Sequence, residues 1–159
     1  MPRQPTLRRI RGFTLIELMI TVAILAITVS LAAPAFKELL VAQRIRSVAY
    51  DMTSDLVLAR SEAVKRGQTV TIAPDGSGWT DGWTVRVPAT ADVITSRSPS
   101  GNGVVFSTSP GTVTFDINGR LGTTSSVVRF QISDGSTRNR CISIDPSGRP
   151  KSVVSACPS

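Results

Sequence analysis

The residue types that most enzyme chemistry needs are sparse in this chain. There is no histidine, which excludes Ser-His-Asp and Cys-His catalysis, imidazole metal sites and histidine pH switching. Ser61 and Lys65 are four residues apart, so a helix would place them on one side, and a Ser-Lys pair can be catalytic. At a charged, exposed helix end such a pair is more typical of solvated side chains. We therefore expect no catalytic residue, no metal, no cofactor and no enzymatic activity.

Cys141 and Cys157 are the only cysteines, too few for a structural zinc site. They stand 16 residues apart late in the chain, a spacing that favours one disulfide and with it an oxidising compartment such as a periplasm. Two buried, reduced thiols are the alternative at this point.

Basic residues gather near the C-terminal end, where the turn signals predict one hairpin. After residue 130 the only acids are Asp134 and Asp145. Guanidinium groups held on a hairpin suit phosphate oxygens, which makes the cluster a candidate DNA-binding site. A solvated basic edge that prevents edge-to-edge pairing of sheets is the alternative. The candidate residues are Arg138, Arg140, Arg149 and Lys151.

The N-terminal segment determines on which side of a membrane the cysteines and the basic residues lie. Phe13 to Ala33 is an apolar run of 21 residues with one charge, Glu17, and is long enough to span a bilayer as a helix. It follows Arg3, Arg8, Arg9 and Arg11, without which the net charge of +7 falls to +3. Because basic residues stay on the cytoplasmic side, the chain after the run is expected in the periplasm.

Two ordinary explanations of the apolar run leave Glu17 unexplained. A secretory signal peptide ends in small residues, and Ala33-Pro34-Ala35 loosely offers such an exit. A plain membrane anchor is the other explanation. A carboxylate in hydrocarbon costs several kcal/mol unless it is paired, and neither segment needs one. Glu17 therefore favours a third role, in which it pairs with a positive group of another molecule.

A long helix is predicted to continue past Pro34 to Arg66, since no glycine interrupts residues 35–66. Gly67, after two basic residues, is a typical helix end. One helical face is apolar and should be buried; Asp55 and the other charged residues lie largely off it. The members of this face are Ile45, Val48, Ala49, Met52, Leu56, Ala59 and Ala63.

From Gln68 onward the pattern has period two, which predicts a β-rich head built as one mostly antiparallel sheet packed on the helix, an α+β architecture. Residues 88–103 are rich in Pro, Ser, Thr and Gly and are expected to form a loop. Trp79 and Trp83 could stack on nucleic-acid bases, although two such residues beside a turn are more typical of a core or an interface. The expected strands are near residues 69–72, 82–87, 104–107, 112–117, 127–132, 141–144 and 152–155.

Gly12-Phe13-Thr14-Leu15-Ile16-Glu17 resembles the processing signal of type IV pilins and type II secretion pseudopilins. Four later segments resemble parts of the GspH/FimT group within that superfamily. They are Ala59-Arg60-Ser61-Glu62-Ala63, Gly82-Trp83, Phe115 to Arg120 and Ser147-Gly148-Arg149. The group comprises the type II secretion pseudopilin H and FimT-like and FimU-like minor pilins. Some FimT-like members bind DNA through a Gly-Arg-x-Arg loop, which here is Gly148-Arg149-Pro150-Lys151.

The resemblance implies a pilin-like fold, cleavage by a prepilin peptidase between Gly12 and Phe13, N-methylation of Phe13, and pairing of the new amine with Glu17 of a neighbouring subunit. Pro34 becomes a soft point of the helix. The expected parts are a leader at 1–12, a membrane and filament-core helix at 13–34, an amphipathic helix at 35–67 and a periplasmic head at 68–159.

The implied function is a minor pilin or pseudopilin of the inner membrane, a structural subunit that primes or caps a filament. Its partners would be other pilin subunits, the prepilin peptidase, the assembly platform and, for DNA uptake, DNA. The alternative is a dedicated type II secretion pseudopilin H without DNA binding.

Overall fold

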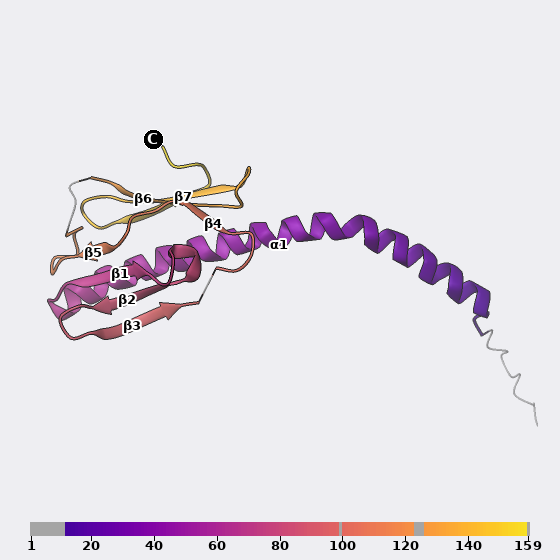
Figure 1. The fold of residues 1–159 in the computed structure, drawn as a ribbon, viewed down its shortest axis with the longest axis horizontal. Helices are drawn as coiled ribbons and strands as arrows, with labels where there is room; N and C mark the ends of the chain where they lie inside the picture. The colour runs from indigo at the N-terminus through magenta and orange to yellow at the C-terminus, as the bar shows by residue number, and fades with distance from the viewer. Residues whose placement is uncertain (1–11, 99, 123–125, 159) are drawn as a thin grey trace, which may run out of the picture. The chain divides into compact units, whose positions relative to one another are not determined.

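The computed structural model describes residues 12–98, 100–122 and 126–158 (Figure 1). A single long helix, α1 (Leu15–Arg66), is followed by eight strands and a short 3-10 turn, η1 (Trp79–Asp81). The chain divides into two compact units, Met1–Glu38 and Leu39–Ser159. The leader at 1–12, except Gly12, lies outside the described residues.

The first unit contains an exposed apolar helix. All residues from Gly12 to Glu38 are exposed, and an 18-residue window of α1 has a mean hydropathy of 2.4. By length and composition this helix can cross a membrane. The hydroxyls of Thr21, Thr28 and Ser30 donate to carbonyl oxygens three or four residues earlier, which satisfies them without water.

In the second unit α1 buries the apolar face that its spacing predicts. All seven residues of that face are buried, from Ile45 to Ala63. The helix ends as predicted at Arg66, because Gly67 adopts φ 60°. The Gly67 amide donates to the Val64 carbonyl and the Gln68 amide to the Ala63 carbonyl, which together cap the last turn.

Two antiparallel sheets of four strands each complete the head. The first has the order β3-β2-β1-β5 and the second β4-β6-β7-β8. The first sheet comprises β1 (Val70–Pro74), β2 (Trp83–Val87), β3 (Asp92–Arg97) and β5 (Val113–Phe115). The second comprises β4 (Val105–Thr108), β6 (Val128–Ser133), β7 (Asn139–Ile144) and β8 (Pro150–Val153).

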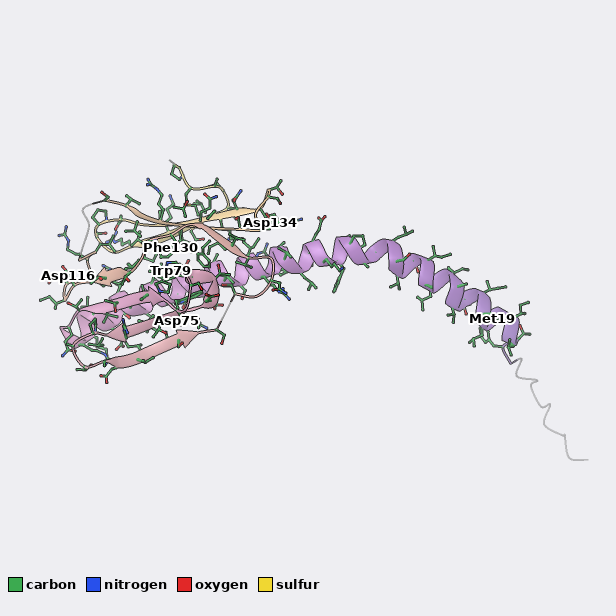
Figure 2. All side chains as sticks on the ribbon, viewed as in Figure 1. Met19, Asp75, Trp79, Asp116, Phe130 and Asp134 are labelled. Atoms are coloured by element: carbon green, nitrogen blue, oxygen red, sulfur yellow. A yellow bond between two sulfur atoms is a disulfide. The ribbon has the colours of Figure 1, made fainter. Side chains whose placement is uncertain are left out.

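One continuous core joins the helix face to both sheets. Trp79 and Trp83 belong to it, with 3% and 2% of their surface exposed, so neither is available to stack on nucleic-acid bases. The Trp79 ring meets Phe130 edge-on at 4.8 Å between centroids (Figure 2). The Trp79 indole N–H donates to the Pro110 carbonyl, so its polar atom is satisfied within the core.

The strand pattern differs from the sequence prediction in two respects. The structure forms two sheets where one was expected. In addition, β3 lies inside residues 88–103, which the sequence predicts to be a loop. Its strand-forming part, Asp92–Arg97, pairs with β2 through a register shift at Val85 and Arg86. The Pro, Ser and Gly residues that suggested a loop lie on both sides of this short edge strand.

Asp55 was expected off the buried face, and this prediction is wrong. Its side chain is 2% exposed and accepts hydrogen bonds from Trp83 Nε1 at 2.9 Å and from Arg97 Nε and Nη2 at 2.8 and 3.0 Å. The hydrogen bond to Asp55 raises the pKa of Arg97 above its ordinary value. A buried carboxylate is tolerated here because three donors surround it.

Replacing Arg97 by alanine should destabilise the head by about 3 kcal/mol, since it leaves a buried carboxylate without its cation. Asp55→Ala should cost less, because it leaves only the neutral Trp83 indole N–H unsatisfied, whereas the Arg97 side chain is 38% exposed and can turn toward water. Both tryptophans lie in the head core, so their fluorescence during urea unfolding of the full chain reports head stability. Arg86→Ala, on an exposed position of β2, is the matched control and should change stability by less than about 0.5 kcal/mol. Equal losses in Arg97→Ala and Arg86→Ala would contradict this account.

Candidate functional site

The helix start at Phe13 to Glu17 has a defined local geometry. Thr14 caps α1: its Oγ1 accepts the Glu17 amide at 3.2 Å and its carbonyl accepts the Leu18 amide at 3.2 Å. Gly12 and Phe13 precede the helix and are exposed. No hydrogen bond or ion pair joins the Glu17 carboxylate to any residue that the structure describes. Glu17 therefore has a fixed backbone and a carboxylate that is available to another molecule.

Pro34 lies within α1, which continues through it without a break. Proline has no amide hydrogen, so the carbonyl four residues earlier, that of Ser30, lacks its usual helical donor. The boundary between the two compact units falls one turn later, after Glu38.

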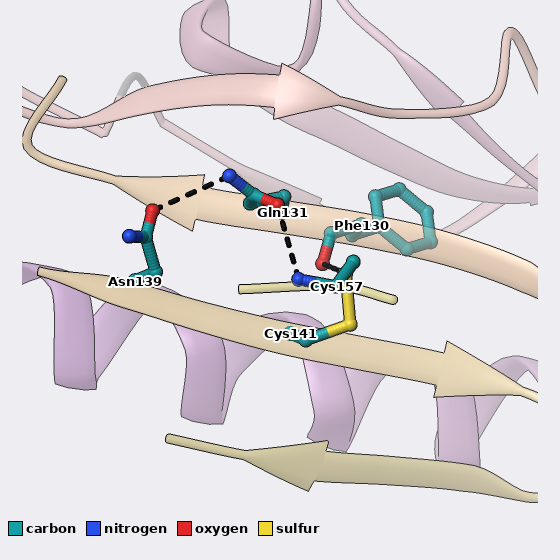
Figure 3. The surroundings of a disulfide bond; sticks show 5 residues. All are labelled: Phe130, Gln131, Asn139, Cys141 and Cys157. Carbon is teal, nitrogen blue, oxygen red and sulfur yellow. Dashed lines mark hydrogen bonds between the residues drawn. A yellow bond between two sulfur atoms is a disulfide. The ribbon is translucent and has the colours of Figure 1, made fainter. Parts of the chain in front are cut away.

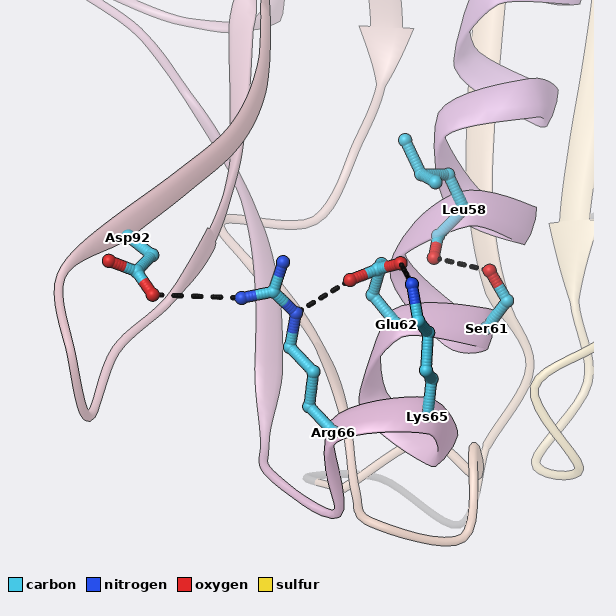
Figure 4. Close-up of polar contacts among 6 residues, drawn as sticks. All are labelled: Leu58, Ser61, Glu62, Lys65, Arg66 and Asp92. Carbon is cyan, nitrogen blue, oxygen red and sulfur yellow. Dashed lines mark hydrogen bonds and ion pairs between the residues drawn. The ribbon is translucent and has the colours of Figure 1, made fainter.

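Ser61 and Lys65 do not contact each other as a catalytic pair would (Figure 4). The Ser61 hydroxyl donates to the Leu58 carbonyl at 2.9 Å, and the Lys65 ammonium lies 3.4 Å from a Glu62 carboxylate oxygen. Arg66 holds the other Glu62 oxygen at 2.6 Å and lowers the pKa of Glu62. These contacts stabilise the last turn of α1.

Cys141 and Cys157 form a disulfide, as their spacing favours, with Cα atoms 4.9 Å apart (Figure 3). Cys141 lies on β7 opposite Gln131 of β6. The Gln131 side chain accepts the Cys157 amide at 3.1 Å and donates to Asn139 at 3.3 Å. The Cys157 sulfur lies 3.4 Å from the Phe130 carbonyl oxygen, a contact without a hydrogen. The bond thus fixes the C-terminal tail to the second sheet.

Three turns of the head share one design, an aspartate followed four residues later by an arginine. In each, the Asp amide donates to the Arg carbonyl and the Asp Oδ1 accepts the Arg amide. The Ser147 hydroxyl, then the Arg149 amide, lower the pKa of Asp145, and the Ser136 amide is the largest cause that lowers the pKa of Asp134. The turns run from Asp116 to Arg120, Asp134 to Arg138 and Asp145 to Arg149.

The structure does not bring the four candidate DNA-binding residues together. Arg138 and Arg140 lie at the start of β7, while Arg149 follows its far end, and a strand of six residues spans about 20 Å. Arg138 and Arg140 instead line a cleft with Arg46 of α1. Arg138 is held by Asp134 at 3.4 Å, whereas no described residue pairs with Arg46 or Arg140.

Arg149 belongs to a second group, formed where two turns touch. A side chain at Gly148 would overlap the Gly119 carbonyl oxygen, and the Leu121 amide donates to the Pro146 carbonyl at 3.3 Å. Arg60 of α1 donates to the same Gly119 carbonyl at 3.0 Å. We call the three cations Arg60, Arg120 and Arg149 the twin-turn cluster. Within the described part of the chain, the guanidinium groups of Arg120 and Arg149 form no hydrogen bond or ion pair.

Lys151 forms a third group with Arg129. Both are cross-strand partners of Ser143, on β8 and β6, so they share the outer face of the second sheet. The Nε of Arg129 is buried and has no partner among the described residues. The sequence prediction missed Arg46, Arg60, Arg120 and Arg129. Only Arg120 had a visible signal, the repeated Asp-x-x-Gly-Arg pattern that it shares with Arg149.

Comparison with known proteins then identifies the fold. The profile of the family described as type II transport protein GspH matches residues 48–148, well over half of the chain. The chain belongs to the GspH family. The prokaryotic N-terminal methylation motif matches residues 7–33 of this GspH-family chain, the segment that contains Phe13 and Glu17.

Solved structures agree with the long helix and the antiparallel head. The type IV minor pilin FimU of Pseudomonas aeruginosa PAO1, in space group P21, is 24% identical with a TM-score of 0.60, covering 73% of this chain and 90% of FimU. A second crystal structure of FimU, in space group P65, is 25% identical to this chain with a TM-score of 0.58. The match covers 72% of this chain and 98% of that FimU chain. No curated protein matches the GspH-family chain.

Loss of the disulfide should destabilise the head of this GspH-family chain by about 3 kcal/mol, because the bond closes a loop of 16 residues. Cys141→Ser/Cys157→Ser and the reduced wild type should agree within about 1 kcal/mol in urea unfolding followed by tryptophan fluorescence. Oxidised wild type is the reference. A double variant as stable as oxidised wild type would mean that the tail contributes nothing to the head.

Proposed function

We propose that this GspH-family chain is a minor pilin or pseudopilin, a structural subunit that primes or caps a filament assembled at the inner membrane. The observation that carries the proposal is the state of the apolar half of α1. Its side chains are exposed, the hydroxyls of Thr21, Thr28 and Ser30 are bonded within the helix, and Glu17, the one charge between Phe13 and Ala33, has no partner among the described residues. Such a surface needs lipid before assembly and other helices afterwards.

Processing supplies the missing partner of Glu17. A prepilin peptidase hydrolyses the Gly12–Phe13 peptide bond with one water, which leaves a carboxylate on Gly12 and a positively charged amine on Phe13. The Phe13 amine then takes a methyl group from a small-molecule methyl donor and releases a proton. Thr14 already caps the helix beyond this bond, so cleavage leaves the cap in place. The amine of one subunit pairs with Glu17 of its neighbour inside the apolar layer, and the cost of leaving either charge unpaired fixes the axial register.

The division of the chain follows from this route. Residues 1–12 are the cytoplasmic leader, 13–34 the membrane and filament-core helix, 35–67 the amphipathic helix and 68–159 the periplasmic head. The leader arginines hold the N-terminus in the cytoplasm, and the disulfide suits a periplasmic head. Pro34 provides a soft point where the helix can adjust between lipid and filament. The partners are pilin-type subunits, the prepilin peptidase and the assembly platform.

The filament is either a type IV pilus or a type II secretion pseudopilus. The likeness to the minor pilin FimU supports the pilus, and the family description supports the secretion role. A dedicated type II secretion pseudopilin H without DNA binding is therefore the alternative form of the proposal. Deletion in a host with both systems, scored for pilus number and for secreted protein, separates the two.

Glu17→Gln should fold but enter filaments at least tenfold less than wild type, since it removes the charge that the neighbour's amine needs. Incorporation is measured by quantifying the chain in sheared filaments against the membrane fraction. Thr21→Ala, a change on the same helix that keeps the charge, should incorporate normally, and tryptophan fluorescence checks the head in both. The measured mass of the mature wild-type protein should equal that of a chain beginning at N-methylated Phe13. Normal incorporation of Glu17→Gln, or a chain that begins at Met1, would contradict the proposal.

We further propose DNA capture as a second function, for one specific observation. The turn that carries Arg149 touches the turn that carries Arg120, with Arg60 beside both. Three guanidinium groups on rigid supports suit successive phosphates. Of the four DNA-binding candidates from the sequence, Arg138, Arg140, Arg149 and Lys151, this proposal keeps only Arg149. It adds Arg60 and Arg120 as further phosphate-binding residues.

DNA binding by the full chain in neutral detergent should show a log–log salt slope near −3, because each phosphate contact contributes about −0.9. Arg120→Gln/Arg149→Gln should reduce the magnitude of the slope by about two units, to near −1. The matched pair Arg138→Gln/Arg140→Gln removes the same charge and should change it by less than one unit. Equal effects of the two pairs would assign binding to net charge, and absence of binding at low salt would leave the purely structural function.

A further inference from the structure

The cleft that contains Arg46, Arg138 and Arg140 has the features of a binding site and is not used by the proposed function. Its volume is about 370 Å³, within the range of sites that hold small ligands or peptide segments. The floor is the α1 segment around Ile45, one wall is the β6–β7 turn near Asp134 (labelled in Figure 2), and the other is the C-terminal tail. All of its lining lies within the second compact unit, Leu39–Ser159.

The cations of the cleft are available to an anion. Strand alternation places Arg140 on the same face of β7 as Ile142 and Ile144, so its half-buried side chain projects beside the helix. No described residue pairs with Arg140 or Arg46. The carboxylate of the adjoining β6–β7 turn, Asp134, accepts hydrogen bonds from the Ser136 amide and hydroxyl and from the Arg138 amide and guanidinium. It therefore does not neutralise the other two arginines.

The rest of the lining is apolar and small, which distinguishes this cleft from a phosphate site. Carbon surface beside the guanidinium groups comes from Ala42, Val154 and Ala156. A bare phosphate leaves the apolar surface exposed to water. A peptide that carries a carboxylate next to an aliphatic side chain covers the apolar surface and pairs with the guanidinium groups. Guanidinium groups bind carboxylates through two parallel hydrogen bonds, a geometry that lysine lacks.

The walls are held before any ligand arrives. The disulfide at Cys157 fixes the tail one residue after Ala156, and four hydrogen bonds to Asp134 fix the turn. A preformed site loses little conformational freedom on binding. We propose that this cleft docks an acidic segment of a partner protein, whose carboxylate binds Arg46 and Arg140 while a neighbouring aliphatic side chain lies against Ala42 and Val154. The inference does not depend on filament assembly or on DNA capture.

The test uses the full chain in neutral detergent with ¹⁵N-labelled arginine. The probe is a pool of acetylated tripeptide amides with a central Glu flanked by Ala, Val or Leu. The Nε–H signals of Arg46 and Arg140, assigned from Arg46→Gln and Arg140→Gln, should shift at millimolar peptide, while the Arg86 signal should not. The matched pool with a central Gln should give shifts at least fivefold smaller.

Two further measurements distinguish the docking of a carboxylate peptide from the binding of phosphate or DNA. Val154→Asn changes a side chain that is 76% exposed, so folding is unaffected, and it should weaken the response to the Leu-containing peptides at least threefold. Inorganic phosphate and duplex DNA, at the same concentration of anionic groups, should shift the two signals less than the Glu pool does.

Three outcomes would overturn the proposal. The first is the absence of any shift of Arg46 and Arg140 at 10 mM Glu pool. The second is an equal shift of all arginine signals, Arg86 included. The third is a stronger response to phosphate or DNA than to the Glu pool, which would make the cleft a phosphate site. Selective shifts that are lost in both arginine variants would establish it as a carboxylate site.

Discussion

The whole head depends on a narrow buried face of one helix. Three of its seven apolar residues are alanines, Ala49, Ala59 and Ala63, and all are essentially inaccessible. Small side chains let backbone and sheet approach closely, so both four-stranded sheets reach the same helix and share one core. The N-terminal half of the same helix has no buried side chain, so a single element has to satisfy two different surroundings.

Local sequence signals were sufficient for the helix. Its face follows from the 3.6-residue period and its end from Gly67, and the structure confirms both because neither requires knowledge of distant residues. Asp55 was misplaced for the opposite reason. Its burial depends on Trp83 and Arg97, two partners from different strands that no local pattern connects to it. The strand β3 was missed because its flanks carry loop-forming residues and only its pairing with β2 makes it a strand.

The basic residues show the same limit at the level of a site. Proximity in sequence suggested one cluster, but the hairpin turns and the alternation of strands divide it among three surfaces. Each surface is completed by an arginine from elsewhere: Arg46 and Arg60 come from the helix, and Arg129 comes from β6. Charge patterning therefore located the C-terminal region correctly as basic, whereas the grouping of its charges required the three-dimensional arrangement.

The contact between Gly119 and Gly148 has a consequence for how this surface can change. Most exposed turns accept insertions because nothing is packed against their backbone. Here a lengthened or branched turn on either side would separate the two backbones and remove the carbonyl that orients Arg60. The two loops, though far apart along the chain, can vary only as a matched pair, so a graft that transfers one without the other would not reproduce the surface.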